Sequence, residues 1–169
     1  MERGLIRIMA KYLSTKTYGN DRGLSCCFRQ WRATHSHCST LHGYSIGIKL
    51  VFECDTLDDK NWCMDFGGLK EFKAWADHMF DHTLVIAEDD PHLETFQKLN
   101  SIKGGFEDSG ICDLRIVPGV GCEMFAKLAY DKMAELLASG DMRYPLNPTV
   151  RIKSVEVFEH GANSATYEG

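Results

Sequence analysis

The stretch Cys38-Ser39-Thr40-Leu41-His42-Gly43-Tyr44 leads directly into a segment, residues 41–53, in which apolar and polar side chains alternate. This alternation predicts a half-buried β-strand. One face of the predicted strand carries His42, Tyr44, Ile46, Ile48, Leu50 and Phe52. Because that face is largely apolar, we expect the imidazole of His42 to point inward. Cys38 lies in a turn-prone segment just before the strand, where a thiol reaches a cavity without being sealed in the core.

Two further histidines lie immediately upstream of this strand. His35 and His37 precede His42, so three imidazoles fall within eight positions. Neutral imidazoles that converge and leave one position open make a catalytic zinc site. Taken alone, one cysteine near one histidine is more often a buried thiol beside a satisfied core histidine. The additional histidines favour a reactive site.

Length and composition are typical of one globular domain, because the chain has 169 residues, 44% hydrophobic and 25% charged. We expect a lead-in over residues 1–23 and a single domain over residues 24–169. A net charge of −5 argues against a nucleic-acid surface as a main function. The chain lacks both a run of about 18 apolar residues and a signal peptide, so we expect no membrane contact and a cytoplasmic location. The seven cysteines are expected to be free thiols.

Hydrophobic periodicity predicts an α+β domain. Strands are expected over residues 24–34, 41–53, 114–117 and 150–159. Apolar stripes predict one helix over residues 69–80 and another from residue 122 to a stop at Gly140, with a short helix near residues 93–99. We therefore expect a four-stranded antiparallel sheet with two main helices on one face. Residues 87–110 are acidic and polar. Two roles are open for them: they could cover the site, or they could form a contact between subunits.

The motif Cys-x-x-Leu-His-Gly, followed by an alternating strand, resembles the tunnelling-fold pterin synthases. The resemblance is strongest to bacterial 6-carboxy-5,6,7,8-tetrahydropterin synthase, with 6-pyruvoyl-tetrahydropterin synthase a more distant relative. Four later segments match in order, and they are Met64-Asp65-Phe66, Phe80-Asp81-His82, Gly121-Cys122-Glu123 and Val157-Phe158-Glu159-His160. The resemblance covers residues 24–167, which is most of the chain.

This resemblance implies a fold, an assembly and a reaction. In the tunnelling fold, sheets of several subunits join edge to edge and the sites form between subunits, so we expect a homo-oligomer, either a trimer or a hexamer. The implied enzyme is a lyase that converts 7,8-dihydroneopterin triphosphate to 6-carboxy-5,6,7,8-tetrahydropterin, releasing acetaldehyde and triphosphate, in the biosynthesis of 7-deazaguanine nucleosides such as queuosine. Two alternatives stay open: formation of the 6-pyruvoyl product, and a metal-free relative that binds a pterin or purine without turning it over.

The same resemblance assigns roles to five side chains. Cys38 is expected to move a proton, with Asp81 and His82 as its relay, the carboxylate setting the tautomer and basicity of the imidazole. Glu159 is expected to bind the amino and ring N–H groups of the pterin, and Glu123 keeps the acid that the family carries near the substrate. Each has a structural alternative. A histidine at the C-terminal end of a helix and a carboxylate in the first turn both interact favourably with the helix dipole and so stabilise the helix. Glu159 could equally be a solvated carboxylate at a strand edge.

Two residues depart from the family at the metal. Arg32 and Tyr44 stand where the resemblance implies zinc-binding histidines, and a guanidinium cannot bind zinc. We expect zinc to be held instead by His35, His37 and His42, after a bulge that turns the first two inward, with Tyr44 lining the site. Zinc would act as a Lewis acid on the substrate hydroxyls. An altered or absent metal is the alternative.

Overall fold

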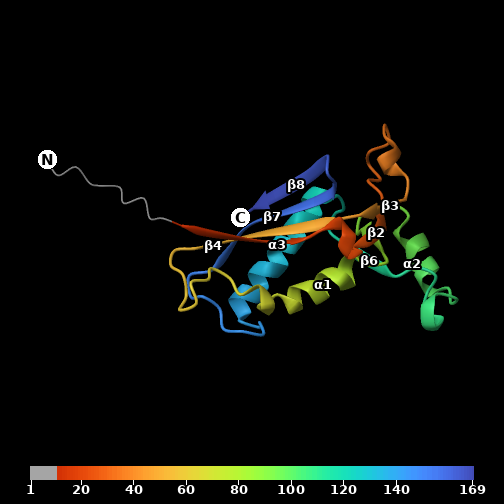
Figure 1. Ribbon diagram of the computed structural model, residues 1–169. Coiled ribbons are helices and arrows are strands. Elements are labelled where there is room, and N and C mark those ends of the chain that lie inside the picture. Colours follow the sequence, from red (N-terminus) through yellow and green to blue (C-terminus); the bar gives the residue numbers. More distant parts are fainter. Residues whose placement is uncertain (1–10) are drawn as a thin grey trace.

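The computed structural model describes residues 11–169, which form two four-stranded sheets and three α-helices (Figure 1). Sheet A has the strand order β1 (Tyr12–Tyr18), β4 (Gly47–Cys54), β7 (Arg151–His160) and β8 (Asn163–Glu168). Sheet B has the order β3 (His42–Ser45), β2 (Ser25–Phe28), β5 (Thr83–Ala87) and β6 (Leu114–Val117). All neighbours in sheet A are antiparallel. In sheet B, β2 and β3 are antiparallel, whereas β5 is parallel to both β2 and β6.

One long, bent hairpin connects the two sheets. Its first arm runs from β1 through a 3-10 turn at Asn20–Arg22 into β2, and its second arm runs from β3 into β4. Asn20 holds the bend, because its side-chain amide donates to the Ser45 carbonyl and its own carbonyl accepts from the Ser45 hydroxyl at 2.9 Å. The N–H of Ile46 donates to the Leu24 carbonyl at 3.0 Å, so hydrogen bonding continues across the bend.

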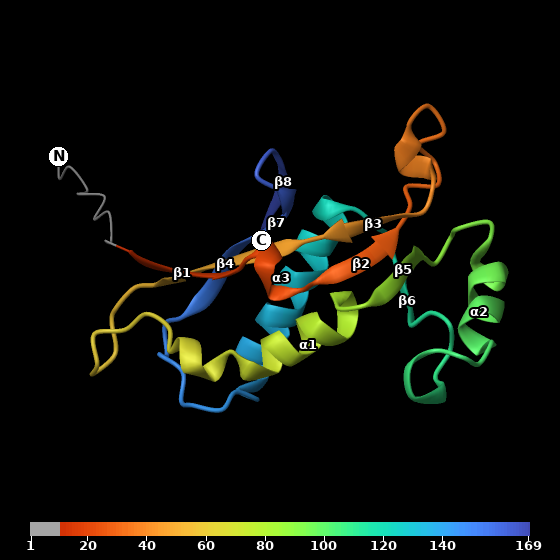
Figure 2. The ribbon, with the colours of Figure 1, turned by 45° about the vertical axis from the view of Figure 1, so that its right-hand side comes forward.

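Two helices, α1 (Lys70–Phe80) and α3 (Cys122–Ser139), lie on the same side of sheet A (Figures 1 and 2). Helix α3 packs along β7 and β8, and α1 packs on β5 and α3. The third helix, α2 (Leu93–Ser101), lies beyond sheet B, at the same end of the molecule as the loop between β2 and β3 (Figure 2). Short 3-10 turns occur at His37–Ser39, Phe66–Gly68 and Phe106–Asp108.

The main core lies between sheet A and the two helices. The alternating segment buries its apolar face as predicted, and its side chains with 0% exposure are Ile46, Ile48, Leu50 and Phe52. Phe125 of α3 joins the two sheets to the helices. Its ring lies 5.0 Å from the ring of Phe28 in β2 and 5.0 Å from the ring of Phe80 in α1. Aromatic packing therefore fixes the end of β2, directly before the Cys38 loop.

The expected four-stranded antiparallel sheet with two main helices on one face is confirmed as sheet A with α1 and α3. The prediction lacks β5, which is buried on both faces between parallel neighbours and therefore shows no alternation. It also lacks β8, which follows β7 through a turn at Gly161 and Ala162 and has mostly exposed side chains. Strand β1 lies within the expected lead-in and forms an edge of sheet A, so its polar side chains face solvent.

The strand expected over residues 24–34 is shorter in the structure, because β2 ends at Phe28. The next residue, Arg29, leaves the sheet to pair with Asp90. Residues 29–41 form a protruding connection, named the Cys38 loop below (Figure 2). The predictions about the N-terminus and the first part of the lead-in fall on residues 1–10, outside the described residues. Among residues 11–169, no helix has the length and apolarity needed to cross a membrane.

Candidate active site

Tyr44 lies at the centre of the candidate site, on β3 where the two sheets meet. Its ring stacks on Phe28 of β2, with centroids 3.9 Å apart and planes inclined by 12°. The ring of His42 lies 4.5 Å away, tilted by 39°. Because Phe28 is 1% exposed, the stack holds Tyr44 against the core. A half-buried aromatic ring thus stands at one position where the resemblance implies a zinc ligand.

Glu159 comes to this site from the end of β7. The side-chain amide of Asn20 donates to the Glu159 carbonyl at 2.8 Å as well as to the Ser45 carbonyl, so one side chain ties β7 to β3. The Glu159 carboxylate accepts a hydrogen bond from the Cys122 thiol, with Sγ 3.8 Å from Oε1. Cys122 is the first residue of α3. The carboxylate therefore lies where β3, β7 and α3 meet.

The groups around Tyr44 influence one another electrostatically. The pKa of the Tyr44 phenol is raised to about 12, first by burial and then by the Glu159 carboxylate and the Cys38 thiol. The pKa of Cys122 is also raised to about 12, by burial and by the carboxylates of Glu159 and Glu123. Both groups are therefore protonated at neutral pH and can donate hydrogen bonds. Glu159 and Cys38 thus both act electrostatically on the Tyr44 phenol, and Glu159 is the one fixed there by hydrogen bonds.

Cys38 lies in the 3-10 turn on the returning side of the Cys38 loop. The hydroxyl of Ser36 caps this turn by accepting from the Cys38 N–H at 3.2 Å. The Cys38 carbonyl accepts from the Gln30 N–H at 2.7 Å, which closes the loop. All seven cysteines are free, as predicted, and Cys38 is the exposed one among them. Its thiol is open to a substrate.

His42 is exposed, so the expectation that its imidazole points into the core is wrong. Although His42 shares a face with Tyr44, it lies at the outer end of β3, next to the protruding Cys38 loop (Figure 2). Its Nδ1 is 2.7 Å from the Thr40 carbonyl oxygen. Because a carbonyl only accepts, Nδ1 carries the hydrogen, and Nε2 of the neutral ring is free to accept a proton or bind a metal ion.

The three imidazoles expected to hold zinc do not converge. His35 and His37 are exposed on the Cys38 loop. Within residues 11–169, no group of three or more Cys, His, Asp or Glu side chains is arranged to hold a metal ion. Arg32, the second departure from the family, is engaged in a surface ion pair, with Nη1 2.6 Å from Oδ2 of Asp89. As placed, these residues supply one ready donor, Nε2 of His42, and do not fit a zinc site.

Asp81 and His82 form the expected pair, with Nδ1 of His82 2.6 Å from Oδ1 of Asp81. The His82 side chain is 86% exposed. Among residues 11–169, no hydrogen bond joins this pair to the Cys38 loop. The role of the pair as a relay for Cys38 therefore stays a prediction.

Glu123, the second carboxylate expected to bind substrate, is exposed in the first turn of α3. It follows Cys122, the residue whose thiol contacts Glu159, and it helps to raise the pKa of that thiol. The two carboxylates thus lie on either side of Cys122. The position of Glu123 also favours the helix through its dipole.

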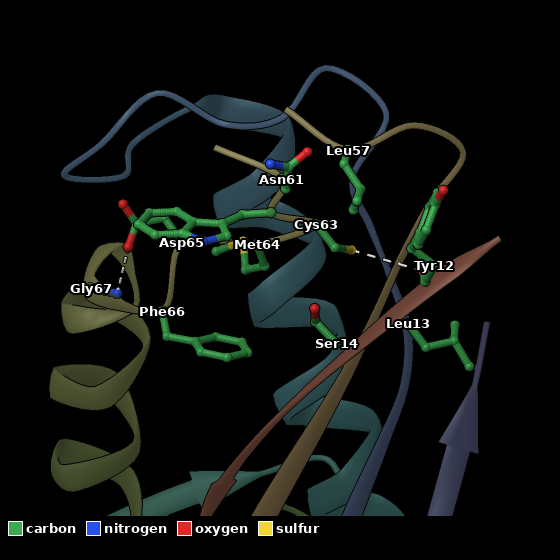
Figure 3. A pocket seen from close by; sticks show the side chains of 11 residues that line it. Tyr12, Leu13, Ser14, Leu57, Asn61, Cys63, Met64, Asp65, Phe66 and Gly67 are labelled. Carbon is green, nitrogen blue, oxygen red and sulfur yellow. Dashed lines mark hydrogen bonds between the residues drawn. The ribbon is translucent and has the colours of Figure 1, made fainter. Parts of the chain in front are cut away.

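A separate hollow of about 480 Å³ lies at the opposite end of the bent hairpin (Figure 3). It is lined by residues 12–14 of β1, by Leu57 and by residues 61–67 before α1. In this hollow, Asp65 accepts from the Gly67 N–H at 2.9 Å and so caps the turn before α1. Burial raises the pKa of the Cys63 thiol to about 12, which leaves it unreactive at neutral pH. The predicted catalytic, substrate-binding and metal-binding residues lie outside this hollow.

Sequence reasoning missed the contacts that hold the site together. Arg29 and Asp90 form a bidentate ion pair at 2.7 and 2.8 Å, and Asn20 ties Glu159 to β3. The first contact had a usable signal. Recognising Thr83–Ala87 as a buried parallel strand would have placed Asp90 at its carboxyl end, beside the end of β2.

Comparison with known proteins supports the resemblance read from the sequence. A model of the 6-pyruvoyl tetrahydropterin synthase family matches residues 20–169. The 6-carboxy-5,6,7,8-tetrahydropterin synthase of Rickettsia conorii is 32% identical over 57 residues, which are 33% of this chain and 41% of that protein. The chain thus spans less than half the length of this curated relative. The protein of the same name from Aquifex aeolicus is 24% identical over 131 residues, which are 78% of this chain and 75% of that protein.

Solved structures show the same fold at low sequence identity. An uncharacterized protein from Wolinella succinogenes has a TM-score of 0.70 and 19% identity, over 94% of this chain and 98% of that one. The 6-pyruvoyltetrahydropterin synthase of Plasmodium vivax has a TM-score of 0.60 and 14% identity, over 94% and 97%. These likenesses confirm the expected tunnelling fold. Because the family match extends over residues 20–169, this chain belongs to the 6-pyruvoyl tetrahydropterin synthase family.

Proposed function

We propose that this protein is a lyase that converts 7,8-dihydroneopterin triphosphate to 6-carboxy-5,6,7,8-tetrahydropterin, with release of acetaldehyde and triphosphate. The observation that carries the proposal is the junction of β3, β7 and α3, where Asn20 ties Glu159 to the strand of Tyr44 and the Cys122 thiol donates to the Glu159 carboxylate. The names of the relatives from Rickettsia conorii and Aquifex aeolicus support the choice of reaction. Seven free thiols suit the reducing cytoplasm, which we propose as its location, in the formation of 7-deazaguanine nucleosides.

In this proposal the chain's own residues bind the ring and move a proton. One Glu159 carboxylate accepts two parallel hydrogen bonds from the amino and ring N–H groups of the pterin. The protonated Cys122 thiol donates to Oε1 of Glu159 and holds the carboxylate in orientation. Cys38 moves the proton, and Glu123 follows Cys122 in the first turn of α3. The neutral phenol of Tyr44 lies stacked on Phe28 at the same junction.

The relay is proposed to be completed by a second subunit. Asp81 orients His82 at 2.6 Å, but within residues 11–169 no hydrogen bond joins this pair to the Cys38 loop, and His82 is 86% exposed. A trimer or hexamer would bring the pair of one subunit to the thiol of another. The edge strands β1 and β8 of sheet A offer unpaired edges for such an assembly.

Replacement of Cys38 tests the proposed chemistry. We expect Cys38→Ala to lower kcat by about 10²–10⁴-fold, the usual contribution of a positioned proton-transfer group, with the oligomer size unchanged. Cys27→Ala is the matched control, because Cys27 is a half-buried thiol on β2 whose side chain packs in the smaller core. A fully active Cys38→Ala protein would rule out the mechanism.

Product analysis tests the choice of reaction. Incubation with 7,8-dihydroneopterin triphosphate should release acetaldehyde and yield the 6-carboxy pterin. Formation of the 6-pyruvoyl compound without acetaldehyde would assign the alternative activity within the family instead.

Mixing two inactive variants tests the shared site. Cys38→Ala lacks the thiol and His82→Ala lacks the imidazole, so a mixed oligomer contains some sites with both groups intact. We expect partial recovery of activity after subunits exchange. Absence of recovery in verified mixed oligomers would show that the relay is not shared between subunits.

Whether the protein binds zinc is tested separately from the proposed reaction. His42 provides one free nitrogen, and His35 and His37 would have to move with the Cys38 loop to join it. When bound, the metal would supply Lewis-acid polarisation of a substrate hydroxyl, and the roles of Cys38 and Glu159 stated above do not depend on it. Elemental analysis of gently purified protein should give about one zinc per subunit if these three residues hold the metal.

A metal-free relative that binds a pterin or purine without turnover is the second candidate function. It is favoured by Arg32, which is engaged with Asp89, and by Tyr44, which is stacked on Phe28. Tight binding of a pterin to protein without zinc, together with no product from the triphosphate, would select this candidate. Turnover by the zinc-free protein would exclude it.

A further inference from the structure

A buried ion pair joins the Cys38 loop to the segment that follows β5. Nε of Arg29 donates to Oδ2 of Asp90 at 2.8 Å, and Nη2 donates to Oδ1 at 2.7 Å. The Asp90 side chain is 1% exposed and that of Arg29 is 18% exposed. Two parallel hydrogen bonds between planar groups fix both distance and orientation. The start of the loop is therefore anchored rigidly.

Each partner of this pair holds a further element. Nη1 of Arg29 donates to the Ser39 carbonyl at 3.5 Å, directly after Cys38. Oδ1 of Asp90 also accepts from the N–H of His92, at the start of α2, at 2.9 Å. Asp90 therefore links the beginning of residues 88–113, the segment between β5 and β6, to both ends of the Cys38 loop.

Gln30 provides a second anchor for the same loop. Its N–H donates to the Cys38 carbonyl at 2.7 Å, and its Nε2 donates to the Val120 carbonyl at 2.9 Å. The side chain passes over Gly121, whose φ is +106° and where an added Cβ would lie 2.2 Å from Nε2 of Gln30. The positive φ favours a glycine there, and an added Cβ would displace the Gln30 amide from its bond to Val120. The loop is thus tied to the connection that leads into Cys122, whose thiol contacts Glu159.

We propose that Arg29 and Asp90 are positioning residues that hold the Cys38 loop, and with it the Cys38 thiol, in its working position. This assigns a role to residues 88–113: their first turn fastens the catalytic loop. The inference rests on the proposed function for its catalytic part, and on the contacts of the loop for its structural part. Neither residue touches the thiol, so both act through the backbone of the loop.

A neighbouring pair supplies the matched control. Arg32 and Asp89 connect the same two segments, with Nη1 2.6 Å from Oδ2. Their side chains are 68% and 45% exposed, whereas Asp90 is 1% exposed. An ion pair in solvent contributes little to stability. If burial makes the difference, loss of Asp89 should leave the loop unchanged.

Hydrogen exchange tests the structural part without any substrate. The reporters are the amides of Gln30, Ala33, Ser36, Ser39 and Thr40, which donate within the loop. We expect Asp90→Asn to accelerate their exchange about tenfold or more, since it removes one of the two acceptors and the negative charge that faces Arg29. Exchange in β4 and β7 reports the global stability and so separates a local effect on the loop from a general loss. The Asp89→Asn control should exchange as the wild type does.

Steady-state kinetics test the positioning part. Asp90→Asn should lower kcat for the pterin triphosphate about tenfold to a hundredfold with little change in KM, because Glu159 still binds the ring. Arg29→Lys keeps the charge and loses the planar fork, so it should show a smaller loss. Combining Arg29→Lys with Asp90→Asn should cost no more than Asp90→Asn alone if the two residues act as a unit.

The outcomes separate this inference from the proposed function. Unchanged loop exchange in Asp90→Asn, or equal effects of Asp89→Asn, would overturn the inference. Faster exchange with unchanged kcat would overturn the positioning role. If the wild type does not turn over the pterin triphosphate, the proposed function fails, and exchange alone decides whether the pair holds the loop. If Asp90→Asn does not fold, Arg29→Lys takes its place in both measurements.

Discussion

The bent hairpin passes through two different environments. Under sheet A its side chains are apolar and wholly buried, as Ile48 and Leu50 show at 0% exposure. At the outer end, the Cys38 loop is held by polar contacts from distant segments, chiefly Arg29 with Asp90 and Gln30 with Val120. The part of the hairpin in sheet A is thus stabilised by burial of apolar side chains, which is not directional. The Cys38 loop is stabilised by a few directional hydrogen bonds.

The two kinds of contact serve different purposes: apolar burial mainly stabilises the fold, and the directional hydrogen bonds mainly position the Cys38 loop. Apolar packing tolerates small shifts, whereas a thiol that moves a proton must lie within hydrogen-bond reach of its partner. Directional contacts such as the Arg29–Asp90 pair position the thiol that closely. Because these contacts are few, loss of a single one should displace the thiol. We therefore expect changes in the core to reduce chiefly stability, and changes around the loop to reduce activity together with a smaller loss of stability.

The largest expected effect on stability is at Phe125. Its ring is 0% exposed and contacts those of Phe28 and Phe80 at 5.0 Å each. Phe125→Ala should lower the free energy of unfolding by about 3–5 kcal/mol, measured by urea denaturation. Phe106→Ala is the matched control, since Phe106 is 82% exposed, and we expect it to change stability by less than about 0.5 kcal/mol. If the two variants lost equal free energy of unfolding, burial of aromatic rings would not be the main source of stability in the core.

The two environments also differ in what the sequence reveals. Burial on one face imposes a two-residue period, so the apolar side of β4 could be predicted from a single sequence. The pairing of Arg29 with Asp90 spans 61 positions, and no local pattern says which acid meets which base. Cys38 and Glu159 were found through the family motifs. Asp81 with His82 was found in the same way, and their hydrogen bond to each other is confirmed, whereas their action on the thiol stays a prediction because the resemblance carries no distances.

Glu159 should show the largest effect on substrate binding. Glu159→Gln keeps the side-chain shape and loses one of the two acceptors proposed for the pterin. We expect KM to rise about 10–100-fold, the usual value of a hydrogen bond to a charged group, with kcat less affected. Glu156→Gln on the same strand is the control, because Glu156 pairs with Lys49. An unchanged KM in Glu159→Gln would remove this residue from the binding site.

The pH dependence of stability should show how much the Arg29–Asp90 pair contributes to holding the Cys38 loop. Burial alone raises the pKa of Asp90, but the hydrogen bonds from Arg29 and the His92 N–H outweigh it and lower that pKa below the usual value. The resulting stabilisation is complete above the unfolded pKa of about 3.9 and is lost as pH falls through the lower folded value.

The difference in free energy of unfolding between wild type and Asp90→Asn should therefore be about 1–3 kcal/mol at pH 7. It should shrink below about pH 4, the region of the unfolded pKa. Urea denaturation between pH 7 and pH 3 measures both values. A difference that stays constant over this range would mean that the charge of Asp90 is not what Arg29 recognises.

The smallest expected effect is at an ion pair of sheet A. Lys49 and Glu156 face each other across β4 and β7, with Nζ 3.3 Å from Oε2 and side chains 41% and 28% exposed. Lys49→Gln should lower the free energy of unfolding by less than about 1 kcal/mol, because solvent screens both charges. The pair resembles Arg29–Asp90 in charge and differs from it in burial and in bidentate geometry. If Lys49→Gln cost as much as Asp90→Asn, burial would not be the property that makes the outer pair important. A small loss here with a large one at Asp90 would locate the vulnerable points of the fold at the loop that carries Cys38.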